Sequence, residues 1–182
     1  MTPAGRAALA CFAAVLLATP VAWGQTPPRP APASAPAPAQ AQARPAVDMV
    51  TEANLSRDGL KAAFDAAKMT TAIDGGGNLT VTLPQVLVHV LPAKDTVRLM
   101  VSFTFAPRAA MQERLDLANR INDGYIIVRA TVAAERAGEL SMDHYIVLGP
   151  GVSRAVIVAA TRRFADVVVE AIRATDTDNL LK

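Results

Sequence analysis

The chain has two histidines, His89 and His144, and both fall in segments whose pattern predicts β-strands. A zinc site needs three or four ligands at matched spacing, and no third ligand accompanies this pair. His144 alternates in register with Met142 and Ile146, so we expect it on the apolar face of its strand. The neighbouring Asp143 then points to the opposite face, which excludes a His–Asp dyad. The sequence therefore predicts no metal site.

The hydroxyl and carboxyl side chains form no catalytic pattern either. Ser102, Ser141 and Ser153 stand outside any Gly-x-Ser-x-Gly motif, and Ser153 is better placed to cap a helix. Glu113 and Asp116 are three residues apart on a predicted helix, where paired carboxylates can serve as acid and base. They alternate with arginines, however, which is typical of a solvated helix face. We predict no catalytic residue, no cofactor and no enzymatic activity.

The only cysteine, Cys11, lies in the N-terminal apolar run "AALACFAAVLLATPVAWG". This run follows a lone Arg6 and ends in a small-x-small pattern at Ala22 and Gly24, as a secretory signal peptide does. We predict a signal peptide over residues 1–24, cleavage before Gln25 and a periplasmic or secreted protein. The alternative is an uncleaved membrane anchor, but the run is short for a span.

The remaining chain divides into a linker and one domain. Seven of the 13 prolines fall in residues 27–45, so residues 25–47 predict a disordered Pro/Ala-rich linker. Residues 48–182 predict a folded domain. Three of the 18 lysines and arginines precede Asp48, which leaves 15 against 16 acidic residues and no dense basic run. This balance argues against a nucleic-acid partner. The cleaved protein is expected to have no stable membrane span and, without cysteine, no disulfide or thiolate site.

Periodicity predicts the first elements of the domain. Residues 56–69 have helical spacing, with Ser56 as the N-cap. The segment "TTAIDGGGNLTVTLP" predicts a β-hairpin whose glycines supply positive φ angles at the turn. The alternative, a phosphate-binding loop, lacks the lysine and the following helix. Residues 85–91 and 96–105 predict two further strands; the second buries Val97, Leu99, Val101, Phe103 and Phe105.

A second helix and a hairpin follow. Residues 107–123 predict a helix that buries Met111, Leu115, Ala118 and Ile121 and ends with Gly124 in the left-handed conformation. "YIIVRATVA" and "LSMDHYIVL" predict paired strands. One face carries Ile126, Val128, Ala130 and Val132 from the first strand. On the polar face, Arg129 and Asp143 are near enough for a cross-strand pair that contributes about 0.2–1 kcal/mol.

The final helix, Val152–Ala174, is more apolar than one buried stripe requires. Its expected core stripe is Val156, Ala160, Phe164, Val167 and Ala171. Arg162, Arg163 and Asp166 interrupt the run, so a membrane span is not expected. The additional apolar residues either cover a large sheet face or contact another chain, including a two-fold copy in a homodimer. We predict the partner surface at Val158, Val168, Val169 and Ile172.

With the short glycine-containing hairpin counted as one strand, the element order is helix, three strands, helix, two strands, helix. This order predicts an α+β domain, a five-stranded antiparallel sheet with helices packed on one side.

Several stretches make this domain similar to a known family. The stretches "LDLANRINDGYIIVRATV", "GELSMDHYIVL" and "GPGVS", with the long last helix, resemble the YbjN family of bacterial sensory transduction regulators. The resemblance covers roughly Ser56 to Ala174. It implies a fold similar to type III secretion chaperones, which are small dimers that hold segments of other proteins. It implies no established enzyme activity and no agreed site residues. The signal peptide and linker depart from the usual cytoplasmic pattern of the family.

Together, the pattern and the resemblance predict an exported, non-enzymatic protein-binding or chaperone-like regulatory module whose partner the sequence does not identify. The alternative is a small-ligand-binding module with a pocket between helix and sheet.

Overall fold

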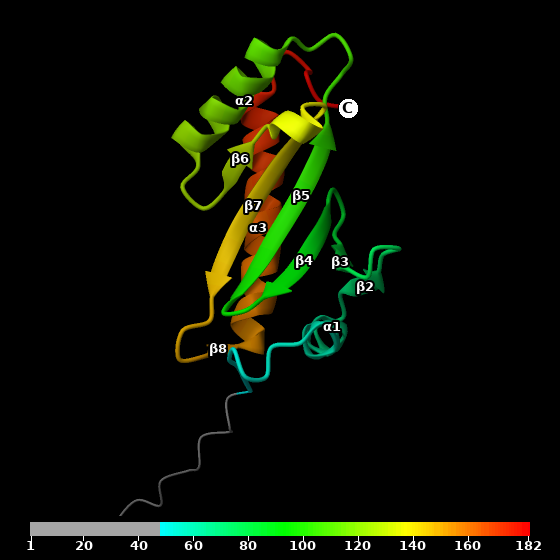
Figure 1. Ribbon diagram of the computed structural model, residues 1–182, viewed down its shortest axis with the longest axis vertical. Helices are drawn as coiled ribbons and strands as arrows, with labels where there is room; N and C mark the ends of the chain where they lie inside the picture. The colour runs from blue at the N-terminus through cyan, green and yellow to red at the C-terminus, as the bar shows by residue number, and fades with distance from the viewer. Residues whose placement is uncertain (1–47) are drawn as a thin grey trace, which may run out of the picture. The chain divides into compact units, whose positions relative to one another are not determined.

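A computed structural model of the chain describes residues 48–182, which form an antiparallel sheet with three helices (Figure 1). The predicted signal peptide and linker lie outside the described residues. The main sheet has six strands in the order β2-β3-β4-β5-β7-β6, each antiparallel to its neighbour. The strands are β2 (Thr70–Ile73), β3 (Leu79–Thr82), β4 (Leu87–Ala93), β5 (Thr96–Thr104), β6 (Arg129–Thr131) and β7 (Glu139–Val147).

The α+β class and the antiparallel sheet are confirmed, but the predicted count of five strands is wrong. Both short strands of the glycine-containing hairpin, β2 and β3, join the sheet, and this raises the count to six. A seventh and eighth short strand, β1 (Met49–Val50) and β8 (Val152–Ser153), pair separately. This small pairing ties the start of the described chain to the start of the last helix.

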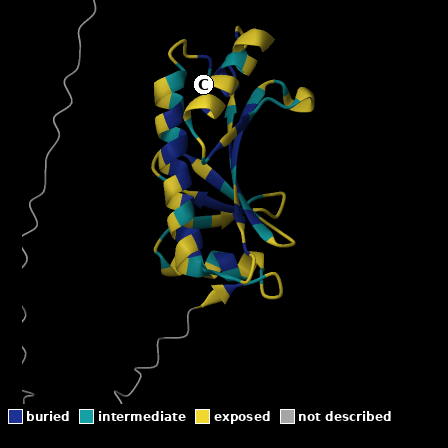
Figure 2. Cartoon of the chain, turned by 90° about the vertical axis from the view of Figure 1, so that its left-hand side faces the viewer, coloured by how far each residue is buried: buried dark blue, intermediate teal, exposed yellow. Residues whose placement is uncertain are grey.

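The three helices are α1 (Arg57–Ala66), α2 (Met111–Gly124) and α3 (Arg154–Thr175). The predicted caps are confirmed at two of them: Ser56 Oγ accepts from the N–H of Gly59, and Ser153 Oγ accepts from that of Val156. Helix α3 runs along one face of the sheet, and its side toward the sheet is buried (Figure 2). Helices α1 and α2 both contact α3.

The buried side of α3 is wider than one stripe and centred elsewhere than predicted. Its central line consists of Ile157, Thr161, Phe164, Val168 and Ala171. Three residues of the predicted stripe, Phe164, Val167 and Ala171, are buried as expected, whereas Val156 in the first turn is exposed. Helices α1 and α2 contact α3 as well as the sheet, which explains why its apolar surface extends well beyond the central line.

In helix α2, the second half of the predicted stripe is buried as expected and the first half is exposed. The helix buries Leu117, Ala118 and Ile121, whereas Met111 and Leu115 are exposed. Its last residue, Gly124, does not have a positive φ, so the predicted left-handed cap is wrong. The chain instead leaves the helix through an extended residue, Tyr125.

The end of α2 is held by a side chain. The amide of Asn122 accepts from the N–H of Ala130 at 2.7 Å and donates to its carbonyl at 2.9 Å. Ala130 is the middle residue of β6, an edge strand of the sheet. One amide therefore joins the end of α2 to the backbone of an edge strand, where unpaired groups would otherwise invite pairing with another chain.

Strand β6 is also shorter than predicted. It contains only three residues, and Ile126, expected on its buried face, lies before it in a turn and is 99 % exposed. Val128 and Ala130 are buried as predicted. The strand starts late because residues 126–127 form a turn between α2 and β6.

The turn between β2 and β3 depends on Asp74 more than on its three glycines. Oδ1 of Asp74 accepts from the N–H groups of Gly76 and Asn78 at 2.9 and 2.8 Å. The backbone and side-chain hydrogen bonds from Asn78 contribute most to lowering the pKa of Asp74, and the bond from Gly76 lowers it further. Of the three glycines in this turn, only Gly77 has a positive φ, 79°. The hairpin is confirmed, while its expected dependence on all three glycines is not.

Candidate functional site

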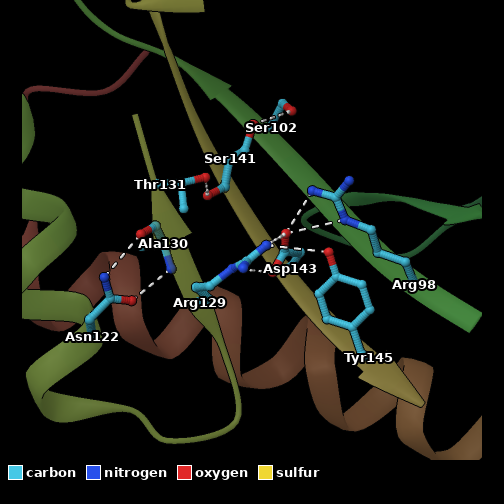
Figure 3. Close-up of polar contacts among 9 residues, drawn as sticks. All are labelled: Arg98, Ser102, Asn122, Arg129, Ala130, Thr131, Ser141, Asp143 and Tyr145. Carbon is cyan, nitrogen blue, oxygen red and sulfur yellow. Dashed lines mark hydrogen bonds and ion pairs between the residues drawn. The ribbon is translucent and has the colours of Figure 1, made fainter. Parts of the chain in front are cut away.

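A cluster of charged and aromatic side chains lies on the face of the sheet opposite α3 (Figure 3). We call this face the outer face. The strand pairing places on it, from β4, β5, β6 and β7, the residues Leu87, His89, Leu91, Arg98, Met100, Ser102, Arg129, Thr131, Ser141, Asp143, Tyr145 and Val147. The inner face, in contact with α3, carries the apolar residues that alternate with them.

Asp143 of β7 is the centre of this cluster. Although Asp143 lies on the outer face, its side chain is only 1 % exposed, because two arginines cover it. Arg129 of β6 binds both carboxylate oxygens, with Nε at 3.1 Å from Oδ1 and Nη2 at 2.9 Å from Oδ2. Arg98 of β5 donates Nε and Nη2 to Oδ2 at 3.2 and 2.6 Å. The predicted pair Arg129–Asp143 is thus confirmed, with a second arginine added.

Tyr145 completes the cluster, two residues after Asp143 on the same face. Its ring lies beside both guanidinium groups, with the carbon atoms Cζ of Arg98 and Arg129 at 5.7 and 5.5 Å from the ring centre. Cation–π attraction favours this arrangement. The Tyr145 hydroxyl accepts a hydrogen bond from Nη2 of Arg129 at 3.3 Å. The hydrogen bond to Asp143 and the charge of that carboxylate raise the pKa of Arg129.

The cluster carries a net charge of about +1 because two guanidinium groups share one carboxylate. The side chains of Arg98 and Arg129 remain 32 % and 60 % exposed. Apolar side chains on the same face are also exposed: Tyr145 beside the arginines, Val147 two residues further along β7 at 65 %, and Leu87 at the start of β4. Arginine and tyrosine beside exposed apolar groups form the composition that is enriched in protein–protein interfaces.

A second candidate is a groove between α3 and the turn that joins β3 to β4. It has a volume of about 600 Å³. The turn contributes Leu83 to Val86, and α3 contributes Arg162, Asp166, Val169, Glu170 and Arg173. A smaller adjoining hollow is lined by Val169, Ile172 and Phe103. This is the size of a small-ligand pocket, with an apolar floor and charges of both signs at its rim.

The four residues predicted as a partner surface do not lie together in the structure. Val158 and Val168 are buried in the core, the first where α1 meets α3 and the second on the central line of α3. Their exposure was therefore predicted incorrectly, since α1 and the sheet cover them. Val169 and Ile172 are half-buried and line the groove described above. A role for these two in contacting a partner stays a prediction.

The two histidines lie on opposite faces of the sheet. His144 pairs with Leu99 on the inner face, as predicted, and stacks on Phe164 of α3 with the ring centres 6.3 Å apart. His89 is on the outer face, where its Nδ1 lies 3.7 Å from Oδ2 of Asp74. Among residues 48–182, no three side chains of the metal-binding types are grouped so that they would hold an ion.

The hydroxyls and carboxylates considered in the sequence take part in local structure. Ser102 and Ser141 face each other across β5 and β7, with their Oγ atoms 3.5 Å apart. Glu113 accepts from the N–H of Ala110 at the start of α2, and Asp116 accepts from the amide of Gln112. None of these groups is placed against another in a way that would activate a nucleophile.

The sequence did not indicate Arg98 and Tyr145 as members of a site. The signal that identifies them is the cross-strand register, in which Arg98 pairs directly with Tyr145, two residues from Asp143. That register depends on β5 and β7 being neighbours although α2 and β6 lie between them in the chain. Within the described part, no helix is long and apolar enough to cross a lipid bilayer.

Comparison with known proteins adds the family. The sequence profile of the YbjN family, described as "Putative bacterial sensory transduction regulator", matches residues 56–176. No curated protein sequence matches the chain. The crystal structure of E. coli YbjN, described as "a putative transcription regulator", is similar to this chain with a TM-score of 0.59 and 17 % identity. The match covers 70 % of this chain and 96 % of that one.

A second solved structure, an uncharacterised protein from Methanothermobacter thermautotrophicus, matches with a TM-score of 0.48 and 11 % identity. It covers 67 % of this chain and 97 % of that chain. At 17 % identity the E. coli structure supports the fold alone, whereas the sequence profile spans well over half of the chain. The chain therefore belongs to the YbjN family, whose members are described as bacterial sensory transduction regulators.

Proposed function

We propose that this protein is an exported, non-enzymatic regulatory module that binds a segment of another protein on the outer face of its sheet. The observation that carries the proposal is the composition of this face. It carries exposed Leu87, Tyr145 and Val147 together with two partly exposed arginines, on a sheet whose other face is covered by α3. Exposed apolar groups cost solubility unless a partner covers them.

Export is the second part of the proposal and is supported by the N-terminal sequence. The lone Arg6, the apolar run and the ending at Ala22 and Gly24 together match a signal peptide. A binding module held at the end of a Pro/Ala-rich segment would act in the periplasm or outside the cell. Self-association is an additional proposal, now limited to the exposed parts of Val169 and Ile172.

The test compares partner capture by matched variants. The protein and two variants, Val147→Glu and Val156→Glu, are immobilised and exposed to a periplasmic extract from the same cells. Both valines are exposed, but Val147 is on the outer face and Val156 is on α3. We expect a protein that is retained by the unchanged protein and by Val156→Glu but lost with Val147→Glu. Equal retention by all three, or no retained protein, contradicts binding at the outer face.

A second candidate function, binding of a small ligand, is favoured by the groove between α3 and the β3–β4 turn. Its volume of about 600 Å³ lies in the range of small-molecule sites. Native mass spectrometry of the purified protein, before and after denaturation, would detect a released compound. Val169→Trp should fill the groove and abolish that signal, while Tyr145→Ala on the outer face should leave it unchanged. A compound that survives Val169→Trp is bound elsewhere.

A further inference from the structure

The arginine pair on the outer face goes beyond what the stability of Asp143 requires. Arg129 alone binds both oxygens of the carboxylate in the bidentate geometry that is strongest for such pairs. Arg98 adds two further bonds to Oδ2, which already accepts one from Arg129. Because Arg129 alone gives the buried carboxylate a bidentate partner of opposite charge, the pairing of Asp143 does not by itself require the second cation.

The groups left over in this cluster are all hydrogen-bond donors. A guanidinium group has five N–H bonds, and the contacts to Asp143 use the Nε and Nη2 atoms of both arginines. Within residues 48–182, neither Nη1 atom of Arg98 or Arg129 has a hydrogen-bond partner. The Tyr145 hydroxyl accepts from Arg129, which leaves its proton available to donate.

The carboxylate of Asp143, the only negatively charged group in the cluster, is inaccessible to a partner. Both oxygens of Asp143 are covered by the two arginines, and its side chain is almost fully buried. Figure 3 shows the two arginines converging on Asp143 from β5 and β6, the strands on either side of β7, with the ring of Tyr145 beside them. The cluster therefore presents donors and a positive charge to solvent, and the chemistry that complements it is a negatively charged acceptor.

We propose that Arg98, Arg129 and Tyr145 bind the carboxylate of an aspartate or glutamate in the partner segment. This rests on the proposed function above and specifies its partner: an acidic segment with apolar residues on either side of the acid. The apolar residues follow from the surroundings: Val147 is exposed two residues beyond Tyr145, and Leu87 is exposed on the same face toward the other end of the sheet, so an extended segment would contact one on each side of its acid. A free anion would leave them uncovered.

The experiment is a selection from random peptides displayed on phage, with the purified protein as the target. We expect selected peptides to be enriched in aspartate or glutamate next to apolar residues. One selected peptide is then synthesised, with a second version in which glutamine or asparagine replaces the acid. The amide version should bind about tenfold to a hundredfold more weakly, the effect of losing hydrogen bonds to a charged group.

Two matched variants locate the site. Arg98→Gln removes the second cation but leaves Asp143 paired with Arg129, and Lys94→Gln removes an exposed cation in the nearby β4–β5 turn. Arg98→Gln should weaken the acidic peptide by a similar factor and have little effect on the amide version, while Lys94→Gln changes neither. Arg98→Lys, which keeps the charge, should retain part of the affinity and serves if Arg98→Gln lowers the melting temperature.

The outcomes separate this inference from the proposed function. Selected peptides without acidic residues that lose affinity with Val147→Glu would overturn the carboxylate inference and leave binding at the outer face intact. Equal effects of Arg98→Gln and Lys94→Gln would overturn the inference too. If no peptide is selected and inorganic phosphate alone binds in an Arg98-dependent way, the site takes a free anion and both proposals fail.

Discussion

At the scale of single residues, the central feature is one buried carboxylate shared by two arginines from two different strands. Asp143 lies on β7, which is paired on both sides, with β5 and β6, and its side chain is buried. Its charge must therefore be compensated by groups from those strands. The two arginines are unequal in their importance for folding. Arg129 donates a hydrogen bond to each carboxylate oxygen, whereas Arg98 contacts only Oδ2, which Arg129 already binds.

This difference predicts unequal costs of substitution. Asp143→Asn leaves both arginines without their shared anion and should lower the free energy of unfolding by about 1–3 kcal/mol. Arg98→Gln leaves Asp143 bound by Arg129 and should cost less than about 1 kcal/mol. Urea unfolding followed by circular dichroism measures both. An Arg98→Gln cost as large as that of Asp143→Asn would show that both arginines are needed for folding.

At the scale of elements, two features determine how the sheet and helices meet. Helix α3 is buried over a wide side because it contacts the sheet, α1 and α2 at once. The edge strand β6 is held to α2 by the two hydrogen bonds of Asn122. Each feature makes a separate prediction about stability.

Neighbouring valines of α3 should differ strongly in their contribution to stability. Val168 is fully buried, so Val168→Ala should lower the free energy of unfolding by about 1–3 kcal/mol through lost contacts and a small cavity. Val169 is half-buried in the groove, and Val169→Ala should cost less than about 1 kcal/mol. Thermal melting of the two variants provides the comparison. Equal costs would mean that α3 is rotated relative to the position described above.

Removal of the Asn122 side chain should open the edge of β6. Asn122→Ala leaves the N–H and carbonyl of Ala130 without their partners and should cost about 1–2 kcal/mol. Hydrogen exchange of the Ala130 amide should become faster, while amides in the central pair β5–β7 change only as far as global stability falls. Unchanged exchange at Ala130 would show that another group protects this edge.

At the scale of the whole molecule, one family domain follows an N-terminal segment with the properties of an export signal. The family profile covers residues 56–176, and residues 48–182 carry 15 lysines and arginines against 16 acidic residues. Against this near-neutral background, the outer face carries one local positive cluster together with exposed apolar groups.

The processing of the chain is the prediction at this scale. Export with cleavage after Gly24 would give a mature protein that begins at Gln25. N-terminal sequencing or intact-mass measurement of the protein from the native cell checks this directly. Arg6→Glu, which reverses the charge before the apolar run, should slow processing. Mature protein that retains Met1 and fractionates with the cytoplasm would contradict export.

The sequence by itself determined the features that depend on neighbours along the chain. Alternation in β5 and β7 correctly assigned Leu99 and His144 to the inner face, and side-chain spacing identified Ser56 and Ser153 as caps. The stretches around Asn122, Asp143 and Ser153, with the long last helix, together carried a resemblance to the family that the profile then confirmed. Local geometry controls all of these, so a short stretch of sequence is enough to predict them.

Only the tertiary structure decided which residues from distant parts of the chain share a surface. Helical spacing cannot say which side of α3 meets the sheet when three neighbours cover it, so the exposure of Val158 and Val168 was predicted incorrectly. Arg98 joined Asp143 because β5 and β7 pair across an intervening helix and strand. Such pairings depend on the packing of the whole domain, which no local pattern of residues encodes.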